Sequence, residues 1–421
     1  MSMKVCVLGS GGREHALAHV LARTAEVVVT PGNPGIATPG RMTSTPAPPE
    51  EIEADLYVIG PEAPLVDGLA DRLRADGRLV LGPGADGARL EGSKAWMKDV
   101  LGEAGVPTAA HETFTELDPA LRHLAATSPP YVVKTDGLAA GKGVLVTESL
   151  AEAAADVEAK LSGRAFGAAG HRIVIEEGLT GHELSLLVLC DGQRVLPLAP
   201  AQDFKRVGDG DLGPNTGGMG AYSPVPMAGP EVVDTVVEQA VEPLVAALRR
   251  RGIDYRGVLY AGLMLTPVGP KVVEYNVRFG DPEAQAVLPR LVGDVAGLLA
   301  EAAAGHLRGD ASFADDACVT VVLAAAGYPS HPRRGDVIGG LEDASAVDGV
   351  MLFHAGTATD ERGQLVTAGG RVLDVTAIGS TLAEARHRAY QAAGRVRWSG
   401  VHYRHDVAEL ASAGTVPEAR R

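Results

Sequence analysis

Two lysines lie at the base and at the tip of a glycine-rich turn. The segment Lys134-Thr-Asp-Gly137-Leu-Ala-Ala-Gly141-Lys142-Gly143 stands between the apolar runs YVV and VLVT. Two such runs around a glycine-rich turn predict a β-hairpin that offers backbone amides and two ammonium groups to a polyphosphate. The GxxxxGK[ST] phosphate loop does not fit, because Asp136 occupies its first glycine position and Gly143 its Ser/Thr position. A plain hairpin with a glycine tip is the alternative interpretation.

Three polar side chains alternate along a predicted strand, at Glu274, Asn276 and Arg278. Successive strand side chains point to opposite faces, so these three share one face and Tyr275 and Val277 share the other. A carboxylate and an amide oxygen are suitable ligands for Mg²⁺ that also binds phosphate oxygens. A solvated edge strand with alternating charge is the alternative.

A third candidate is the turn Gly9-Ser-Gly11-Gly12-Arg13-Glu14, which joins a predicted strand to a predicted helix. The amides of a helix N-terminus bind anions. Dinucleotide binding fits poorly, because Glu14 replaces the third glycine of GxGxxG and Thr30-Pro31 stands where an acidic residue is expected. A turn that only packs the helix on the strand is the alternative.

The elements around this turn predict a doubly wound domain. Strands are expected at 4–8, 27–30, 56–60 and 78–82, with helices after the first glycine turn and at 66–75. Parallel strands that alternate with helices are typical of an α/β sheet covered on both faces.

From Gly92 the pattern changes to that of a smaller α+β unit. A helix in SKAWMKDVLGEAG precedes the hairpin strands 131–134 and 143–147, and a further helix is expected at 149–161. We expect strands 172–177 and 184–192 to complete this unit, which we interpret as a lid.

The segment 202–224 is rich in Gly, Asp, Asn and Pro and has no apolar periodicity, so we expect a long functional loop. A helix at 229–250 and strands at 258–265 and 271–277 follow. The last hundred residues alternate short strands with turns and then form one helix, for which Thr381 and Glu384 predict a capping box.

Composition limits the classes of function. The 421 residues suggest about three domains, and 46% hydrophobic with 22% charged residues is typical of a globular protein. The formal net charge of −15 argues against binding to nucleic acid or to an anionic membrane. Three cysteines in no metal-binding spacing indicate buried thiols, and no signal peptide or membrane span is evident, so we expect a cytoplasmic location. His15 and His19 lack the HExxH order of a zinc site.

Taken together, these segments resemble the glycinamide ribonucleotide synthetases of the ATP-grasp superfamily. The resemblance runs from the first strand to about residue 395, and its most specific stretches are PGNPG (31–35), GPEAPL (60–65), LEGSKAWMK (90–98), KTDGLAAGKGV (134–144), VGDGDLGPNTGGMGAYSP (207–224) and EYNVRFGDPEAQ (274–285). It implies an α/β and α+β multidomain fold. The implied parts are an N-terminal Rossmann-like domain at 1–102, an ATP-grasp region at 103–317 with a mobile lid at about 121–187, and a small β-rich C-terminal domain at 318–421.

The resemblance also implies a set of site residues. ATP would be bound by Lys94, Lys134, Gly137, Gly141, Lys142, Gly143, Glu176, Glu177, Leu179 and Glu183. Substrate would be bound by Gly11, Gly12, Arg13, Asn33, Glu62, Gly217, Gly218, Met219 and Gly220. The catalytic residues would be Lys134, Arg278 and Asp203, and Glu274 with Asn276 would hold Mg²⁺ or Mn²⁺.

The implied reaction joins glycine to 5-phosphoribosylamine with ATP as cosubstrate, in a monomer. Three departures from the family pattern stand out. Phe204 replaces an expected histidine, Val277 replaces a common cysteine, and strand 259–265 lacks the acidic metal ligand of many ATP-grasp enzymes. The alternatives are another ATP-grasp ligase, a nicotinamide-dependent oxidoreductase and a non-catalytic nucleotide-binding module. The C-terminal domain would either complete the site or only pack against it.

Overall fold

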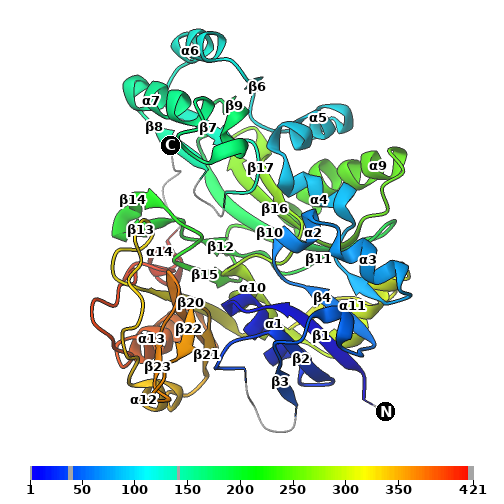
Figure 1. Cartoon of the computed structure of the whole chain (residues 1–421), viewed down its shortest axis with the longest axis vertical. Coiled ribbons are helices and arrows are strands. Elements are labelled where there is room, and N and C mark those ends of the chain that lie inside the picture. Colours follow the sequence, from blue (N-terminus) through cyan, green and yellow to red (C-terminus); the bar gives the residue numbers. More distant parts are fainter. Residues whose placement is uncertain (1, 37–40, 140–142, 416–421) are drawn as a thin grey trace.

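The structure, a computed structural model, describes residues 2–36, 41–139 and 143–415. Four sheets of four or five strands form its framework. In Figure 1 the N-terminal sheet lies at the lower right, a small sheet lies at the top, and the C-terminal sheet lies at the lower left. A central sheet stands between the small sheet and the other two, so it is the element that all parts of the chain can reach.

The N-terminal sheet is parallel, with strand order β3-β2-β1-β4-β5. Its strands are β1 (Lys4–Gly9), β2 (Glu26–Pro31), β3 (Met42–Ser44), β4 (Leu56–Ile59) and β5 (Val80–Leu81), and the helices after them are α1 (Gly12–Leu21), α2 (Glu62–Val66), α3 (Leu69–Ala75), α4 (Ala85–Gly92) and α5 (Lys94–Ala104). The predicted doubly wound domain is thus confirmed. The predicted helix 66–75 is instead split, because Gly68 adopts a φ of 77° that a continuing helix cannot use.

The central sheet is antiparallel, with order β11-β10-β16-β17. It comprises β10 (His182–Asp191), β11 (Val195–Pro197), β16 (Arg256–Thr266) and β17 (Gly269–Asn276), and the helices that follow are α10 (Glu283–Val287) and α11 (Val295–Ala304). The predicted helix 229–250 is α8 (Pro230–Val236), a π-helical turn (Val237–Val241) and α9 (Glu242–Arg250). Pro243 lacks the N–H that an α-helical ladder needs here, which accounts for the wider turn before it.

The small sheet has order β6-β9-β7-β8 and its own core. It comprises β6 (His111–Phe114), β7 (Tyr131–Thr135), β8 (Val144–Thr147) and β9 (Ile173–Glu176), with α6 (Leu117–Ala126) and α7 (Leu150–Leu161) packed on it. The predicted hairpin of β7 and β8 is confirmed. The expectation that strand 184–192 completes this unit is wrong, because that strand is β10 and pairs with β16 along its whole length.

The C-terminal sheet has order β12-β15-β20-β24-β21, with α13 (Leu382–Ala393) packed against it. Its strands are β12 (Gln202–Asp203), β15 (Gly220–Ser223), β20 (Ala317–Ala324), β21 (Val350–His354) and β24 (Arg371–Gly379). The predicted loop 202–224 is therefore wrong, since it supplies β12, β15 and the hairpin of β13 (Arg206–Gly208) and β14 (Leu212–Asn215). Every residue of β15 is buried, so this strand lacks the alternation that would reveal it in the sequence.

Smaller elements complete the chain. They are β18 (Leu291–Val292), β19 (Ser312–Phe313), α12 (Leu341–Ser345), β22 (Thr357–Thr359), β23 (Leu365–Thr367) and α14 (Glu409–Ser412). At the start of α13 the Thr381 hydroxyl accepts the Glu384 N–H at 3.2 Å, as predicted. The Glu384 carboxylate accepts the N–H of Ser380 rather than that of Thr381, so the capping box is only half formed.

All three cysteines are buried free thiols, as expected. Among the described residues, no helix combines the length and apolarity needed to cross a membrane.

The separate core of the small sheet predicts that it can be weakened by itself. Leu124→Ala removes a fully buried side chain of α6 and should destabilise this unit by about 2–5 kcal/mol. Native-state hydrogen exchange should become faster in β7 and β9 and stay unchanged in β20 and β24. Leu150→Ala is the control, because Leu150 belongs to the same unit and is 41% exposed. Equal acceleration in both sheets would contradict the separate core.

Candidate active site

One cavity of about 750 Å³ is lined by residues of the small, central and C-terminal sheets and by residues from the helices and turns of the N-terminal domain. Charged side chains of both signs are prominent in its wall. The charged lining residues are Arg13, Glu62, Glu91, Lys94, Lys134, Glu176, Glu177, Glu183, Asp203, Lys205, Arg206, Asp211, Glu274, Arg278, Asp281, Glu283 and Arg371. Carboxylates outnumber the basic residues even here, so an anionic substrate has to be bound locally by the basic residues Arg13, Lys94, Lys134, Lys205, Arg206, Arg278 and Arg371.

Lysines from α5 and β7 form one end of this cavity. Lys134 Nζ donates to the Val273 carbonyl at 2.9 Å and lies 3.0 Å from Glu176 Oε1. Lys94 Nζ donates to the Gly137 carbonyl at 3.1 Å, and Gly137 and Gly143 also line the wall. Burial lowers the pKa of Lys94, an effect that the negative charge of Glu274 opposes. A nucleotide phosphate here would place a further anion beside Lys94 and beside Lys134, which already faces Glu176.

The predicted adenine region lies beside these lysines. Glu176, Glu177 and Leu179 all line the cavity. Their apolar neighbours on the wall are Met97, Pro130, Val132, Leu138, Val144, Val146 and Met264. An apolar slot with a few polar groups is the usual environment of a bound aromatic ring.

Glu274 and Asn276 reach the cavity from β17. Glu274 Oε1 lies 3.8 Å from Lys205 Nζ, and Asn276 Oδ1 lies 3.4 Å from Arg278 Nη2. Burial acts to raise the pKa of Glu274, but Lys205, Lys134, Lys94 and Arg278 together hold it below its ordinary value. The carboxylate is therefore ionised, as a metal ligand must be.

The donor set fits a metal that is shared with phosphate. Among the described residues, no cluster of three or more His, Cys, Asp or Glu is placed to hold a metal ion. Mg²⁺ commonly uses one or two carboxylates and completes its shell with phosphate oxygens and water. One carboxylate and one amide oxygen opposite two lysines match that pattern, and β16 offers the hydroxyl of Tyr260 rather than a further carboxylate.

Two carboxylates from the N-terminal domain hold Arg278. Its Nη2 lies 2.8 Å from Glu91 Oε1, and its Nε lies 3.4 Å from Glu62 Oε2. Glu91 Oε2 also accepts the backbone N–H of Val277 at 2.8 Å. Burial acts to lower the pKa of Arg278, but Glu91 and Glu62 raise it above its ordinary value. A permanently charged guanidinium is thereby aimed at the same space as Glu274 and Asn276.

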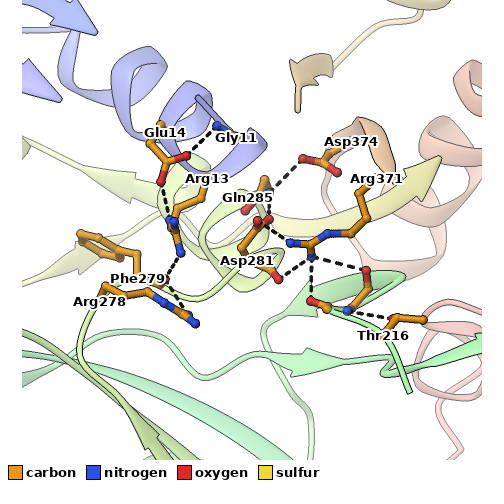
Figure 2. Close-up of polar contacts among 12 residues, drawn as sticks. Gly11, Arg13, Glu14, Thr216, Arg278, Phe279, Asp281, Gln285, Arg371 and Asp374 are labelled. Carbon is orange, nitrogen blue, oxygen red and sulfur yellow. Dashed lines mark hydrogen bonds and ion pairs between the residues drawn. The ribbon is translucent and has the colours of Figure 1, made fainter. Parts of the chain in front are cut away.

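Arg13 reaches the same region from the first turn of α1. Its Nε lies 2.6 Å from Glu14 Oε1, and its Nη1 donates to the Phe279 carbonyl at 3.3 Å. Figure 2 shows Arg13 and Arg278 on either side of Phe279. The anion site expected at the bare helix N-terminus is partly filled by Glu14 itself, which accepts the Gly11 N–H at 2.7 Å.

Several predicted substrate residues stand behind the wall instead of on it. Gly11, Gly12, Asn33, Gly218, Met219 and Gly220 are not among the described residues that line the cavity. A Cβ at Gly12 would overlap the Asp374 carboxylate, which explains the glycine by close packing. Asn33 Nδ2 donates to the carbonyls of Ser10 and His354, and Met219 is fully buried. Gly141 and Lys142 lie outside the described residues.

The remaining predicted residues meet at the cavity. Arg13, Glu62, Lys94, Lys134, Gly137, Gly143, Glu183, Asp203, Gly217, Glu274, Asn276 and Arg278 all line it. Sequence reasoning missed Glu91, Lys205, Asp281, Glu283 and Arg371 on this wall, and the buried Lys98 behind it. Lys98, for example, lies 3.2 Å from Glu176 Oε1, and burial lowers its pKa to about 8. It stands one helical turn after Lys94, and that spacing was the only signal of its role.

The departures at Phe204 and Val277 leave the cavity wall intact. Neither residue is among those that line it. The Phe204 ring lies 4.8 Å from the Arg404 guanidinium carbon and 6.3 Å from the Tyr222 ring. Phe204 thus packs against Tyr222 of β15 and against Arg404, and Val277 is fully buried.

The cavity places lysines opposite a carboxylate and an arginine, and the small sheet with its hairpin covers it. This combination of fold and site is that of the ATP-grasp ligases. Family models for the three parts of phosphoribosylglycinamide synthetase match the chain in order. The N domain matches residues 3–91, the ATP-grasp (A) domain 92–284 and the C domain 318–410. The chain belongs to the phosphoribosylglycinamide synthetase family. It is therefore a ligase, and the oxidoreductase and non-catalytic alternatives are wrong.

Close relatives match along nearly the whole chain. A phosphoribosylamine–glycine ligase from Pseudomonas aeruginosa is 49% identical over 98% of this chain and 99% of its own length. One from Rhizobium meliloti is also 49% identical, over 96% of this chain and 98% of its own.

Solved structures agree with this assignment. A crystal structure of phosphoribosylamine–glycine ligase from Thermotoga maritima is 35% identical, covers 96% of this chain and 100% of its own, and has a TM-score of 0.84. A biotin carboxylase from Campylobacter jejuni is 12% identical over 96% of this chain and 93% of its own, with a TM-score of 0.70. The latter likeness is one of fold alone.

The double contact of Glu91 predicts a loss of activity when it is altered. Glu91→Gln removes one charge beside Arg278 and leaves an oxygen for the Val277 N–H, so kcat should fall about tenfold to a hundredfold through a displaced guanidinium. Steady-state kinetics would measure this. Glu91→Ala should lower kcat further, because both contacts are lost. Asp99→Asn, at an exposed position on α5, is the control. Unchanged kcat in Glu91→Gln would show that this carboxylate does not orient Arg278.

Proposed function

We propose that this cavity ligates glycine to 5-phosphoribosylamine with ATP, forming glycinamide ribonucleotide, ADP and phosphate through glycyl phosphate, a step of purine biosynthesis. The observation that carries the proposal is the placement of Lys94 and Lys134 opposite Glu274, Asn276 and Arg278 in one cavity. That arrangement binds a nucleoside triphosphate and leaves room beside its terminal phosphate for a carboxylate. The relatives, which are named for glycine and phosphoribosylamine, supply the substrate pair.

In the first step an oxygen of the glycine carboxylate attacks the γ-phosphorus, and the bond to the β,γ-bridging oxygen breaks to release ADP. A carboxylate is already a nucleophile, so the site needs alignment and charge neutralisation rather than a catalytic base. Lys134 and Arg278 are the residues that stabilise charge on the transferring group. Lys94, Gly137, Gly141, Lys142 and Gly143 hold the other phosphates, and Glu183 is assigned to the ribose.

Glu274 and Asn276 are the residues that would hold Mg²⁺, or Mn²⁺ in its place. When bound there, the ion would neutralise part of the negative charge on the phosphates. Lys205 lies 3.8 Å from Glu274 Oε1 and supplies a positive charge at the same carboxylate. Binding of the metal would therefore compete with this weak ion pair.

In the second step the amine of phosphoribosylamine attacks the acyl carbon of glycyl phosphate, the bond from that carbon to the phosphate oxygen breaks, and the released phosphate takes up the proton that the nitrogen loses as the amide forms. Asp203, on the cavity wall, is assigned to orient the amine, and Arg13, Glu62 and Gly217 bound the space it occupies. Acyl phosphates react with water, so the small sheet and its hairpin would act as the lid that excludes it.

We also propose that the enzyme acts as a monomer in the cytoplasm. Its three functional parts correspond to residues 1–102, 103–317 and 318–421. The free buried cysteines accord with a reducing compartment.

Purified protein with ATP and Mg²⁺ should release ADP only when glycine and freshly made 5-phosphoribosylamine are both present. Coupled ADP detection, with chromatographic identification of glycinamide ribonucleotide, measures this directly. Glycine alone and the amine alone are the controls. ADP release with a different carboxylate and amine would keep the ATP-grasp chemistry and reject the substrate assignment.

Glu274→Ala should reduce kcat by about a hundredfold or more, because the ligand of the charge-neutralising metal is lost. The melting temperature should change little, since Glu274 faces the cavity and not a core. Activity is measured over a range of Mg²⁺ concentrations, and Glu409→Ala on α14 is the control for loss of an exposed glutamate. Normal turnover at saturating Mg²⁺ would reject the metal assignment.

A further inference from the structure

Arg371 is the residue through which β24 of the C-terminal sheet reaches the cavity, as Asp203 does for β12. Arg371 lines the wall, and no other described residue after 317 does so. Its Nη1 donates to the Gly217 carbonyl at 2.6 Å and to the Asp281 carbonyl at 2.7 Å. Its Nη2 lies 2.6 Å from Asp281 Oδ2. A single guanidinium thus connects two segments that are far apart in the sequence and that both line the cavity.

Asp281 is at the centre of a wider polar junction, which Figure 2 shows in full. Its Oδ1 accepts from Gln285 Nε2 at 2.7 Å, and the same Nε2 donates to Asp374 Oδ2 at 2.9 Å. Burial acts to raise the pKa of Asp281, but Arg371, Arg13 and Arg278 hold it below its ordinary value. The Asp281 carboxylate is therefore charged and forms an ion pair with Arg371.

The contacts of Arg371 distinguish positioning from substrate binding. An arginine offers five N–H donors, and those of Nη1 already meet two backbone carbonyls while Nη2 meets a carboxylate. The guanidinium side chain is 20% exposed and Asp281 19%, so the pair is mostly covered. Its geometry is that of a brace between the Gly217 turn and the segment that follows Arg278.

The position of this brace indicates which substrate it serves. The lysines expected to hold the nucleotide come from α5 and β7, whereas Arg371, Gly217 and Asp281 come from the C-terminal sheet, the segment before β15 and the segment after β17. The glycine carboxyl group lies between the two other substrates, because it first reacts with ATP and then with the amine. The amine must therefore approach the acyl carbon from the side away from the nucleotide. The wall left for the amine is the part that contains Arg13, Gly217, Asp281 and Arg371.

We propose that Arg371 is a positioning residue for the phosphoribosylamine part of the cavity, where it holds the Gly217 turn and Asp281 in register. The proposal rests on the proposed function. It assigns to the C-terminal sheet a role in binding the amine substrate and its product, and none in binding ATP.

Two variants test the proposal. Arg371→Met keeps the length of the side chain without any donor, and Arg371→Lys keeps the charge but has no planar fork to bridge two segments. For each variant, kcat and the KM values for ATP, glycine and 5-phosphoribosylamine are measured, together with calorimetric binding of the stable product glycinamide ribonucleotide. Arg388→Met is the matched control, since Arg388 lies on α13 and pairs with Asp348 and Glu384 away from the cavity.

Arg371→Met should raise the KM for the amine and the Kd for glycinamide ribonucleotide about tenfold or more, and leave the KM for ATP within about twofold. The same KM and Kd values of Arg371→Lys should fall between those of wild type and Arg371→Met. Those of Arg388→Met should match the wild-type values. Should Arg371→Met fail to fold by circular dichroism, the lysine variant carries the same comparison. A parallel rise in the KM for ATP, or unchanged affinity for glycinamide ribonucleotide, overturns the proposal.

The wild-type measurements separate this proposal from the function on which it rests. Wild type that neither binds glycinamide ribonucleotide nor uses phosphoribosylamine would reject the proposed function and Arg371's role with it. If wild type binds glycinamide ribonucleotide and uses phosphoribosylamine, and the Arg371 variants have the same KM and Kd values as wild type, only the role of Arg371 is rejected.

Discussion

The structure depends on keeping several cations close together inside an acidic protein before any substrate arrives. Each of three cations is paired with at least one carboxylate from another segment of the chain. Lys134 pairs with Glu176, Arg278 with Glu91 and Glu62, and Arg371 with Asp281. Buried charges are tolerated when they are paired and hydrogen-bonded, and removal of one partner is costly. The pairs therefore fix the relative positions of the sheets as much as they prepare the cavity for phosphate.

This constraint also explains why the site is built at the junction of the sheets. Lys134 and Glu176 both belong to the small sheet, but Arg278 and Arg371 are paired with carboxylates of other elements. Glu91 comes from α4 and Arg278 from the end of β17, while Asp281 and Arg371 join that same segment to β24. The stretch from Val277 to Asp281 is held at its start by Glu91, in its middle by Arg13 and at its end by Arg371. Alignment of substrates by such a stretch requires all three contacts at once.

The sequence predicted the local features well, because local features depend on periodicity and turn chemistry. The parallel N-terminal sheet, the β7–β8 hairpin, and the shared placement of Glu274, Asn276 and Arg278 at the cavity follow from patterns within a few residues. What could not be predicted lies in long-range pairing. The β15 strand is short and buried on every side, and Glu91, Asp281 and Arg371 acquire their roles only from partners far away in the chain. Burial of Gly12 against Asp374 likewise has no local signal.

The pairing of β15 with β20 has a consequence for modularity. The segment 202–223 leaves the central sheet, contributes β12 and β15 to the C-terminal sheet, and then returns to α8. A fragment that starts at residue 318 would expose the edge of β20 where β15 normally pairs, and unpaired strand edges promote aggregation. The C-terminal part is thus a domain in the linear order of the chain but not a separable folding unit. Recombination between relatives would need to exchange both segments together.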